Sequence, residues 1–273
     1  MSDNDHVSPS AFEDLYVAFY RRVARNEPDA EQHKDADLYW LLTGAAHSMG
    51  NVVLRAHWKG SDPETLRELI ATTMRPFQMR QVPMVWYLWP TSTPADLGDH
   101  LAAAGLVHAG DSPMMALDLT LPLLSSEPPP AVHIERATDP DTYARWVNVG
   151  LDGHGFWEET KVILRPMFDR LGYDDQALQY LAWLDDEPVA TATLFLNDET
   201  AGVYNVATLP GARGKGIGSA ITARCLRDAH DAGCHYALLL SSAMGLPMYR
   251  RLGFTTEGTV AHYYWRPEPA GGE

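Results

Sequence analysis

Cysteine is scarce in this chain, and positive charge is outnumbered. The 273 residues include two cysteines, 21 Lys and Arg and 36 Asp and Glu, so the formal net charge is −15. Two cysteines without metal-ligand spacing argue against a disulfide framework and a structural metal site, and favour a reducing compartment. The acidic balance argues against nucleic acid and anionic membranes as partners. It favours a cationic partner, although an acidic surface also serves solubility alone.

Long apolar runs are also missing. None approaches the length that spans a membrane, and the first ten residues are acidic without an apolar segment. We therefore expect a cytoplasmic protein with no secretory signal and no membrane partner. A chain of this length with 45% hydrophobic residues can fill two cores, so two domains are expected. Monomer and homodimer both remain open.

A glycine-rich segment between an apolar run and a helical pattern carries the main chemical signal. Residues 206–209 end a strand-like run, and residues 210–216 hold glycines and two cations. Apolar residues at Ile217, Ile221 and Cys225 then predict a helix. A strand, a glycine loop and a helix start bind phosphate, because backbone N–H groups converge at the positive end of the helix dipole.

Two familiar phosphate-binding loops are excluded by single residues. The P-loop requires a hydroxyl residue after Lys215, where Gly216 stands instead. The dinucleotide fingerprint requires a closing Gly or Ala, but Ser219 and Ile221 occupy that place in the two possible frames. The pattern that remains is Arg-x-x-Gly-x-Gly at residues 213–218.

A second pattern follows in the expected order. Residues 237–254 form an apolar run, a small-polar loop and a short helix that ends in Tyr-x-x-Leu-Gly-Phe. Together the two patterns resemble the GNAT acetyltransferase family, whose [QR]-x-x-G-x-[GA] loop holds the pyrophosphate of acetyl-CoA. The resemblance covers the second half of the chain. It implies an α+β domain in which helices flank a mixed central β-sheet.

The resemblance also implies which residues hold acetyl-CoA. Backbone N–H groups of the loop bind the pyrophosphate, the loop cations add charge, and the backbone of the preceding strand pairs with the pantetheine arm. Many members carry an Asn that contacts CoA at the position of Ser242, whose side chain is shorter. No metal is expected. The implied cofactor-binding residues are Ala207, Thr208, Leu209, Arg213, Gly214, Lys215, Gly216, Ile217, Gly218, Ser219 and Ser242.

The catalytic groups are a proton donor and a proton acceptor. Tyr249 matches the family's tyrosine, which implies that it protonates the departing thiolate. Some members carry a base on the strand before the loop, but residues 201–205 contain no carboxylate. The base is therefore open, and each candidate could act through a water molecule. The candidates are Glu158, Glu159, His154 and Glu199, with the first two preferred.

The first half repeats the second in a weaker form. Leu101–Leu106 aligns with Tyr249–Phe254, and a strand-like and a helical segment precede each in the same order. Between those segments the first half has Lys59-Gly60-Ser61, with no Arg-x-x-Gly-x-Gly pattern. We therefore predict two GNAT-like domains. They are a degenerate domain without a cofactor loop over 1–120, a Pro-rich linker over 121–131 and an acetyltransferase domain over 132–268.

The predicted function is N-acetyltransfer. An acetyl group would move directly from acetyl-CoA, the co-substrate, to a primary amine of a small molecule or peptide. One alternative is a non-catalytic acyl-CoA sensor or interaction module, in keeping with the missing base. Another is a tandem acetyltransferase that resembles mycothiol synthase.

Overall fold

The computed structural model describes residues 7–124 and 127–268. It divides into two compact units, each assembled from separated segments of the chain. Unit 1 consists of Met1–Leu15 and Pro113–Glu257, and unit 2 consists of Tyr16–Ser112 and Gly258–Glu273. The chain therefore passes from one unit to the other at three points.

Each compact unit groups strands that pair with one another, whereas the predicted domain boundaries divide the chain into its first and second halves. Strand β5 (Val107–Asp118) pairs with β10 (Tyr236–Leu240) in unit 1, although most of the first half lies in unit 2. Strand β11 (Thr255–Trp265) pairs with β4 (Met84–Leu88) in unit 2, although it ends the second half. The division into 1–120, 121–131 and 132–268 stays a prediction about the sequence. Residues 125–126 of the predicted linker lie outside the described residues.

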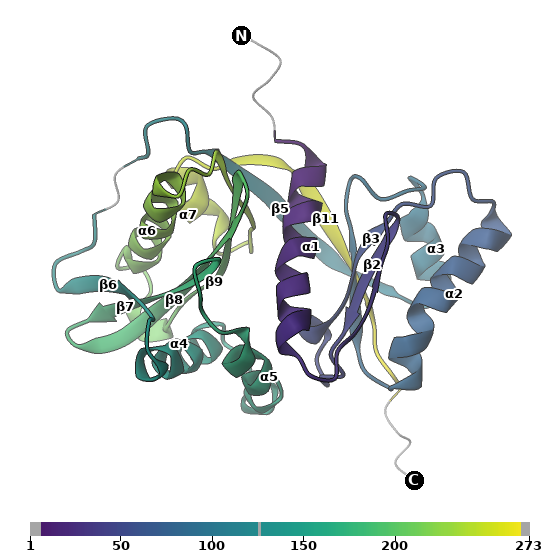
Figure 1. The fold of residues 1–273 in the computed structure, drawn as a ribbon, viewed down its shortest axis with the longest axis horizontal. Coiled ribbons are helices and arrows are strands. Elements are labelled where there is room, and N and C mark those ends of the chain that lie inside the picture. Colours follow the sequence, from purple (N-terminus) through teal and green to yellow (C-terminus); the bar gives the residue numbers. More distant parts are fainter. Residues whose placement is uncertain (1–6, 125–126, 269–273) are drawn as a thin grey trace. The chain divides into compact units, whose positions relative to one another are not determined.

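Unit 1 is a mixed sheet between two pairs of helices. Its strand order is β5–β10–β9–β8–β7–β6, with β9 parallel to β10 and the other pairs in this order antiparallel. Helices α6 and α7 lie on one side of this sheet and α4 and α5 on the other (Figure 1). The remaining bounds are β6 Val132–Arg136, α4 Pro140–Gly153, α5 Glu158–Leu171, β7 Ala177–Leu184, β8 Glu187–Asn197, β9 Thr200–Thr208, α6 Ile217–Asp231 and α7 Leu246–Arg251, with a 3₁₀ turn at Pro210–Ala212.

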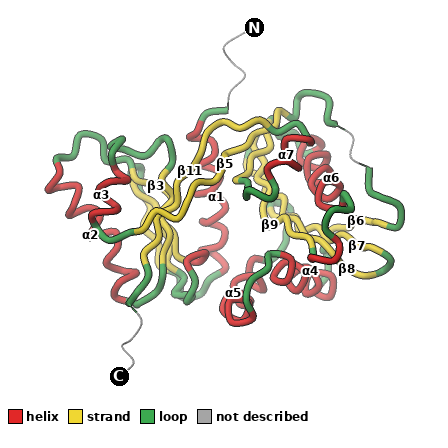
Figure 2. The backbone as a smooth tube through the Cα atoms, turned by 180° about the vertical axis from the view of Figure 1, so that it is seen from behind, coloured by secondary structure: helices red, strands yellow, loops and turns green. Residues whose placement is uncertain are grey.

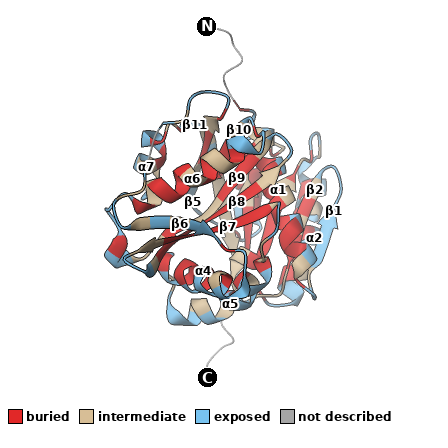
Figure 3. Ribbon diagram, turned by 60° about the vertical axis from the view of Figure 1, so that its left-hand side comes forward, coloured by how far each residue is buried: buried red, intermediate tan, exposed pale blue. Residues whose placement is uncertain are grey.

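The side chains of β8 point alternately to the two faces of the sheet, which explains why helices cover both faces. Ala190, Ala192 and Leu194 join the apolar core that contains Ile217 and Ile221 of α6. The alternate residues Thr191 and Thr193 therefore face α4 and α5 and are also fully buried. Figure 3 shows the buried residues concentrated on β8, β9 and the inner face of α6.

Unit 2 repeats the plan on a smaller scale. Its strand order is β1–β2–β3–β4–β11, with β3 parallel to β4 and the other pairs antiparallel. Helices α2 and α3 cover one face of these strands (Figure 2), and Tyr16 of α1 packs on Tyr87 and Trp89 from the other. The remaining bounds are α1 Pro9–Asn26, β1 Glu31–Lys34, β2 Leu38–Leu42, β3 Asn51–Ala56, α2 Pro63–Met79 and α3 Leu97–Ala103, with a 3₁₀ turn at Ser48–Gly50.

The order strand, helix, strand, helix occurs in both units. Unit 2 has β3, α2, β4 and α3, and unit 1 has β9, α6, β10 and α7. In each case the two strands are parallel neighbours. The predicted class, an α+β chain with two GNAT-like domains, is confirmed. Over residues 7–124 and 127–268, no helix is both long and apolar enough to cross a membrane.

Candidate active site

The two parallel strands of unit 1 separate halfway along their length. β9 pairs with β10 from Thr200 to Gly202, and no further pairing of the two strands occurs within the described residues. From Val203 to Thr208, β9 is paired only with β8, so its other edge is open. An open strand edge presents N–H and C=O groups to which an extended ligand can add like a further strand.

A β-bulge at Asn205 sets the direction of the open edge. The β8–β9 register shifts between Thr191 and Thr193, and Asn205 has a left-handed φ of +50°. Beyond the bulge, Ala207 faces Gly153 at the end of α4. Thr208 faces Gly218 of α6 on the other side. The two predicted pantetheine-binding positions thus lie next to the two helices that line the open edge.

Leu209 is the third predicted pantetheine-binding position, and its backbone N–H and C=O groups already form hydrogen bonds within the protein. Its N–H donates to the Val189 carbonyl at 2.9 Å, and its carbonyl accepts from the Ala212 N–H at 2.9 Å. Because Arg213 Nε donates to the Thr208 carbonyl as well, the open backbone groups are those before that carbonyl. The interaction of Leu209 with pantetheine stays a prediction.

The loop before α6 has the geometry of an anion cradle. Gly214 and Gly216 have φ of +76° and +80°, which only glycine adopts readily. Helix α6 begins after Gly216 with no side chain capping its first turn. The first N–H groups, including those of Ile217, Gly218 and Ser219, can therefore meet a phosphate group. This loop fits the pyrophosphate of CoA.

The two cations of the loop have different surroundings. Arg213 donates from Nε to the Thr208 carbonyl at 3.1 Å and from Nη2 to the Gly153 carbonyl at 3.0 Å. It therefore ties the end of β9 to the end of α4. Lys215 is exposed and forms no ion pair with the described part of the chain. Of the two, Lys215 is the cation with its charge unengaged.

Gly153 lies so close to β9 that no larger residue fits. A Cβ atom on Gly153 would stand 2.9 Å from the Ala207 Cβ and 3.3 Å from the Thr208 nitrogen. Gly153 is the last residue of α4. Its role depends on a contact with a strand far along the chain, which no local pattern indicates.

Tyr249 lies at the centre of α7 with its ring buried. The ring packs edge-on against Phe254, with ring centroids 5.7 Å apart. It also covers Gly245, where a Cβ atom would stand 2.8 Å from the Tyr249 Cε2. Burial raises the pKa of the Tyr249 phenol well above its ordinary value. The hydroxyl makes no hydrogen bond to the described residues and stays protonated, as a proton donor must be.

Ser242 forms the turn that leads into the same short helix, whose N-cap is Gly245. Its Oγ accepts a hydrogen bond from the Gly245 N–H at 3.1 Å, and its carbonyl accepts from the Leu246 N–H. The hydroxyl thus already holds the helix start. Its contact with CoA stays a prediction.

The two preferred candidates for the base lie in the first turn of α5. Glu158 is exposed and forms an ion pair with Lys161 at 2.7 Å, and Lys161 also contacts Asp152 of α4 at 2.7 Å. Glu159 is exposed on the same turn. These contacts hold α5 against α4. The carboxylates remain accessible to water, and their role as base stays a prediction.

The remaining two candidates differ sharply in position. Glu199 precedes β9 and faces His235 at 3.6 Å. At about 3.3 Å per residue, it lies roughly 25 Å along the strand from Ala207, so the structure does not bring it to the open edge. His154 directly follows Gly153. Although the residue reaches the surface, its ring lies beside Phe156 and Phe168, and burial lowers the pKa of His154.

In unit 2, the strand edge and the helix start that correspond to those of β9 and α6 are occupied by the unit's own residues. Within the part of the chain that the structure describes, strands β3 and β4 pair only at Val52–Val85 and Val53–Trp86. Beyond these pairs the Trp89 indole donates to the Leu54 carbonyl. The first turn of α2 is capped by the Asp62 carboxylate, which accepts from the N–H groups of Glu64 and Thr65 at 3.0 and 3.1 Å. The carboxylate occupies the place that an anion takes at an open helix start.

Comparison with known proteins agrees with this geometry. Residues 137–254 match the acetyltransferase (GNAT) family. A mycothiol acetyltransferase of Cellulomonas flavigena is 29% identical over 188 residues, which are 62% of this chain and 53% of that relative. The match therefore spans about half of the relative's length.

Solved structures show the same fold along nearly the whole chain. A GCN5-related N-acetyltransferase from Kribbella flavida has a TM-score of 0.73 and 19% identity, covering 95% of this chain and 96% of its own. A tandem GNAT protein from the clavulanic acid biosynthesis pathway has a TM-score of 0.61 and 12% identity, covering 99% and 98%. At these identities the likeness concerns the fold.

The open strand edge and the uncapped helix start both lie in the part of the chain that matches the GNAT family. That part, residues 137–254, is similar to GNAT acetyltransferases.

Proposed function

We propose that the protein transfers an acetyl group from acetyl-CoA directly to a primary amine of a small molecule or peptide. One observation carries this proposal. The open edge of β9 from Val203 to Thr208 runs into a glycine cradle and the uncapped start of α6. The edge suits an extended amide chain and the cradle suits a diphosphate, so the arrangement fits the two halves of CoA.

The residues of unit 1 divide the work of binding. The N–H groups of Gly214, Gly216 and the first turn of α6 would bind the pyrophosphate, with Lys215 adding charge. The free edge at Ala207 and Thr208 would hold the pantetheine amides and orient the thioester. Acetyl-CoA, as co-substrate, supplies the thioester carbonyl that the amine attacks. Holding both reactants in place accounts for much of the acceleration in such a transfer.

Tyr249 and a base would carry out the two proton transfers of the reaction. Tyr249 would give its phenolic proton to the sulfur as the C–S bond breaks. Among the open candidates for the base, the geometry favours His154 over Glu158 and Glu159. Its lowered pKa leaves the imidazole neutral at pH 7 and able to accept the proton of the amine, and it adjoins Gly153 at the open edge.

The acceptor is an amine, and the net charge of −15 favours one that carries further positive charge. A second candidate comes from the matched relative, which is named a mycothiol acetyltransferase. On that reading the acceptor is the amine of the mycothiol precursor. Direct assay of that precursor beside a panel of diamines, aminoglycosides and short peptides separates the two readings.

The test measures CoA binding by calorimetry and thiol release with dithiobis-nitrobenzoate. Binding of CoA with thiol release on addition of one of the amines supports the proposal. CoA binding without release for any amine, the mycothiol precursor included, would favour the non-catalytic sensor. Absence of CoA binding would overturn both readings.

A further inference from the structure

Three polar side chains, half-buried Asn205 and buried Thr193 and Gln179, form a continuous hydrogen-bonded row across β9, β8 and β7, which we call the polar ladder. Asn205 donates from Nδ2 to Thr193 Oγ1 at 3.1 Å, and Thr193 donates to Gln179 Oε1 at 2.5 Å. Gln179 then donates from Nε2 to the Gly172 carbonyl at 2.8 Å. Thr193 and Gln179 are fully buried. Each donor points the same way along the row, so the bonds reinforce one another.

One end of the polar ladder is the bulge of β9. Thr191 donates from Oγ1 to the Asn205 carbonyl at 2.9 Å, while the Asn205 amide donates to Thr193. Both the backbone and the side chain of the bulged residue are therefore held by β8. Asn is among the few side chains that adopt the left-handed conformation without large strain, which suits the φ of +50°.

The other end lies at the C-terminus of α5. Gly172, with φ of +68°, donates its N–H to the Tyr143 hydroxyl at 2.7 Å. Tyr143 of α4 in turn donates to the Phe168 carbonyl at 2.5 Å. The polar ladder thus connects the bulge to both helices that cover this face of the sheet.

The bulge decides what the open edge presents. Successive residues of a strand alternate in both their side-chain face and the direction of their N–H and C=O groups, so a slip of one residue reverses everything beyond it. With the bulge, Ala207 faces Gly153 and Thr208 faces Gly218. Without the extra residue these faces would exchange, and the peptide groups at the open edge would be different ones.

Packing alone does not explain the polar ladder. The opposite face of the same strands is apolar, with Tyr180, Ala192 and Leu194 in the core. Buried polar groups are costly unless each finds a partner, and apolar side chains of similar size would fill this space without that cost. A satisfied polar row in such a place instead specifies one register among several.

We propose that the polar ladder is a positioning device for the acyl donor. It fixes the bulge at Asn205 and so determines which peptide groups of residues 206–208 face the open edge. Asn205, Thr193 and Gln179 are positioning residues, since they act through the backbone of β9. The inference rests on the proposed binding of acetyl-CoA.

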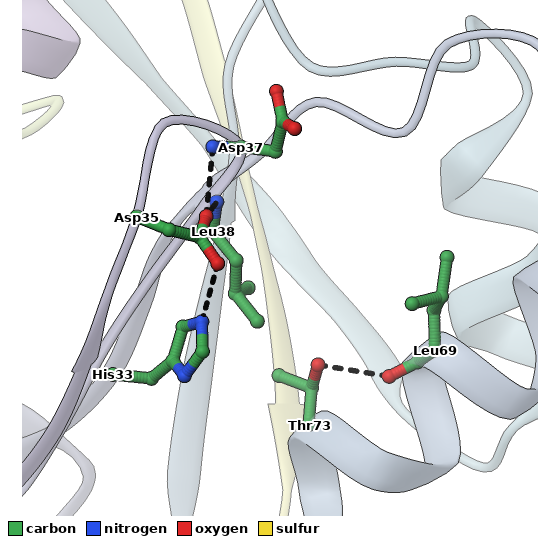
Figure 4. A network of polar contacts seen from close by, with 6 residues as sticks. All are labelled: His33, Asp35, Asp37, Leu38, Leu69 and Thr73. Atoms are coloured by element: carbon green, nitrogen blue, oxygen red, sulfur yellow. Dashed lines mark hydrogen bonds and ion pairs between the residues drawn. The ribbon is translucent and has the colours of Figure 1, made fainter.

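The test compares two threonines with equally simple chemistry. Thr193→Val removes the central hydroxyl of the ladder at almost constant volume. Thr73→Val is the matched control, because Thr73 is also buried and its Oγ1 bonds only the Leu69 carbonyl at 2.8 Å, within α2 of unit 2 (Figure 4). We expect Thr193→Val to weaken CoA binding about tenfold, with a matching rise in KM for acetyl-CoA and a smaller change in kcat. Thr193→Ser keeps the hydroxyl and is expected to stay within about twofold of the parent protein.

A second variant guards against loss of folding. Asn205→Gly retains the left-handed backbone and removes the amide from the ladder, so it tests the same link in a chain that can still form the bulge. We expect several-fold weaker CoA binding. If Thr193→Val or Asn205→Gly folds and binds CoA as the parent does, the positioning role is wrong. If the parent protein itself binds no CoA, the proposed function fails, and the positioning role fails with it.

Discussion

The indole nitrogen of Trp89 lies 2.8 Å from the carbonyl oxygen of Leu54 and donates a hydrogen bond to it. Next to this bond, Thr93 pairs with β3 like a short strand: its N–H donates to the Ala56 carbonyl at 3.1 Å, and its carbonyl accepts from the Trp58 N–H at 3.0 Å. In unit 1 the matching edge of β9 is open. Unit 2 therefore occupies, with its own residues, the place where unit 1 leaves the backbone groups of β9 open.

We predict that the full chain binds one molecule of CoA. Unit 2 has its strand edge covered by Trp89 and Thr93, and the start of α2 capped by Asp62. Isothermal titration with CoA is expected to show one site per chain, and Arg213→Glu is expected to remove it. Two sites of similar affinity would contradict the prediction. Asp62→Ala controls for the cap: it is expected to lower the thermal midpoint without creating a second site.

Arg213→Glu is expected to abolish CoA binding. The substitution removes the bonds to Thr208 and Gly153 and places a negative charge beside the phosphate cradle. Lys215→Gln is expected to weaken binding less, because it removes charge and leaves the backbone tie intact. Calorimetry measures both. The control is Arg67→Glu on the exposed side of α2 in unit 2, which carries the same charge change. Unchanged CoA affinity in Arg213→Glu would show that CoA binding depends neither on the tie that Arg213 makes between β9 and α4 nor on a contact of Arg213 with CoA.

Tyr249→Phe is expected to keep CoA binding and to slow turnover by about a hundredfold, the usual contribution of a positioned acid. The phenol pKa is raised by burial, so the acid stays protonated and kcat should not fall as pH rises toward 10, the ordinary tyrosine pKa. The pH profile of kcat measures this. Normal turnover by Tyr249→Phe would remove the tyrosine from the mechanism. The role of Tyr249 would then be limited to packing against Phe254 and Gly245.

The proposed role of His154 as the base predicts how activity changes with pH below neutrality. A base works when unprotonated, and burial lowers the His154 pKa below its ordinary value of about 6.5. The value of kcat/KM for the amine is therefore expected to rise with pH through that lowered pKa and to be level by neutral pH, if no other group limits it. His154→Gln should lower kcat without changing CoA affinity. Activity and a pH profile equal to those of the parent would return the role of base to Glu158 or Glu159.

Gly153→Ala tests the contact between α4 and β9. The new methyl group would stand 2.9 Å from the Ala207 Cβ, so helix or strand must shift, at a cost of about 1–3 kcal/mol. We expect a lower thermal midpoint together with weaker CoA binding. Gly211→Ala is the control for stability, because a Cβ atom there meets nothing within 4 Å. Equal midpoints for the two variants would show that the α4 contact is loose.

Elements with a strong local pattern are predictable from this sequence. The apolar run at 201–208 predicts the strand found at Thr200–Thr208, and the periodic residues after Gly216 predict helix 218–230, found at Ile217–Asp231. The cradle is predictable for the same reason, since its glycines stand together between a strand and a helix. Their left-handed φ angles are a local property of the chain.

Elements that form only through pairing are missed. The four side chains of β1 at Glu31–Lys34 are all exposed. With no buried face there is no alternation to detect, and the strand exists because β2 pairs with it. β5 likewise begins at Val107 and runs through Gly110 and Pro113, two residue types that weaken a strand pattern.

The polar ladder and the Gly153 contact are beyond sequence reasoning for a related cause. Thr193 and Gln179 look like ordinary polar residues in apolar strands. Their meaning appears only when the β7–β8–β9 register aligns Gln179 with Thr193 and Thr193 with Tyr204, beside the bulge. Such alignments depend on residues far apart in the chain.

The sharing of β5 and β11 bears on how such a protein can evolve and be engineered. A cut in the Pro-rich linker would leave the second half without the strand that pairs with β10, and the first half without the strand that pairs with β4. Each fragment would expose an unsatisfied sheet edge, a known route to aggregation. The two halves are therefore not interchangeable modules. A copy of the fold whose strand edge is filled can persist because the sheet of the other unit cannot be completed without the strand that its half of the chain supplies.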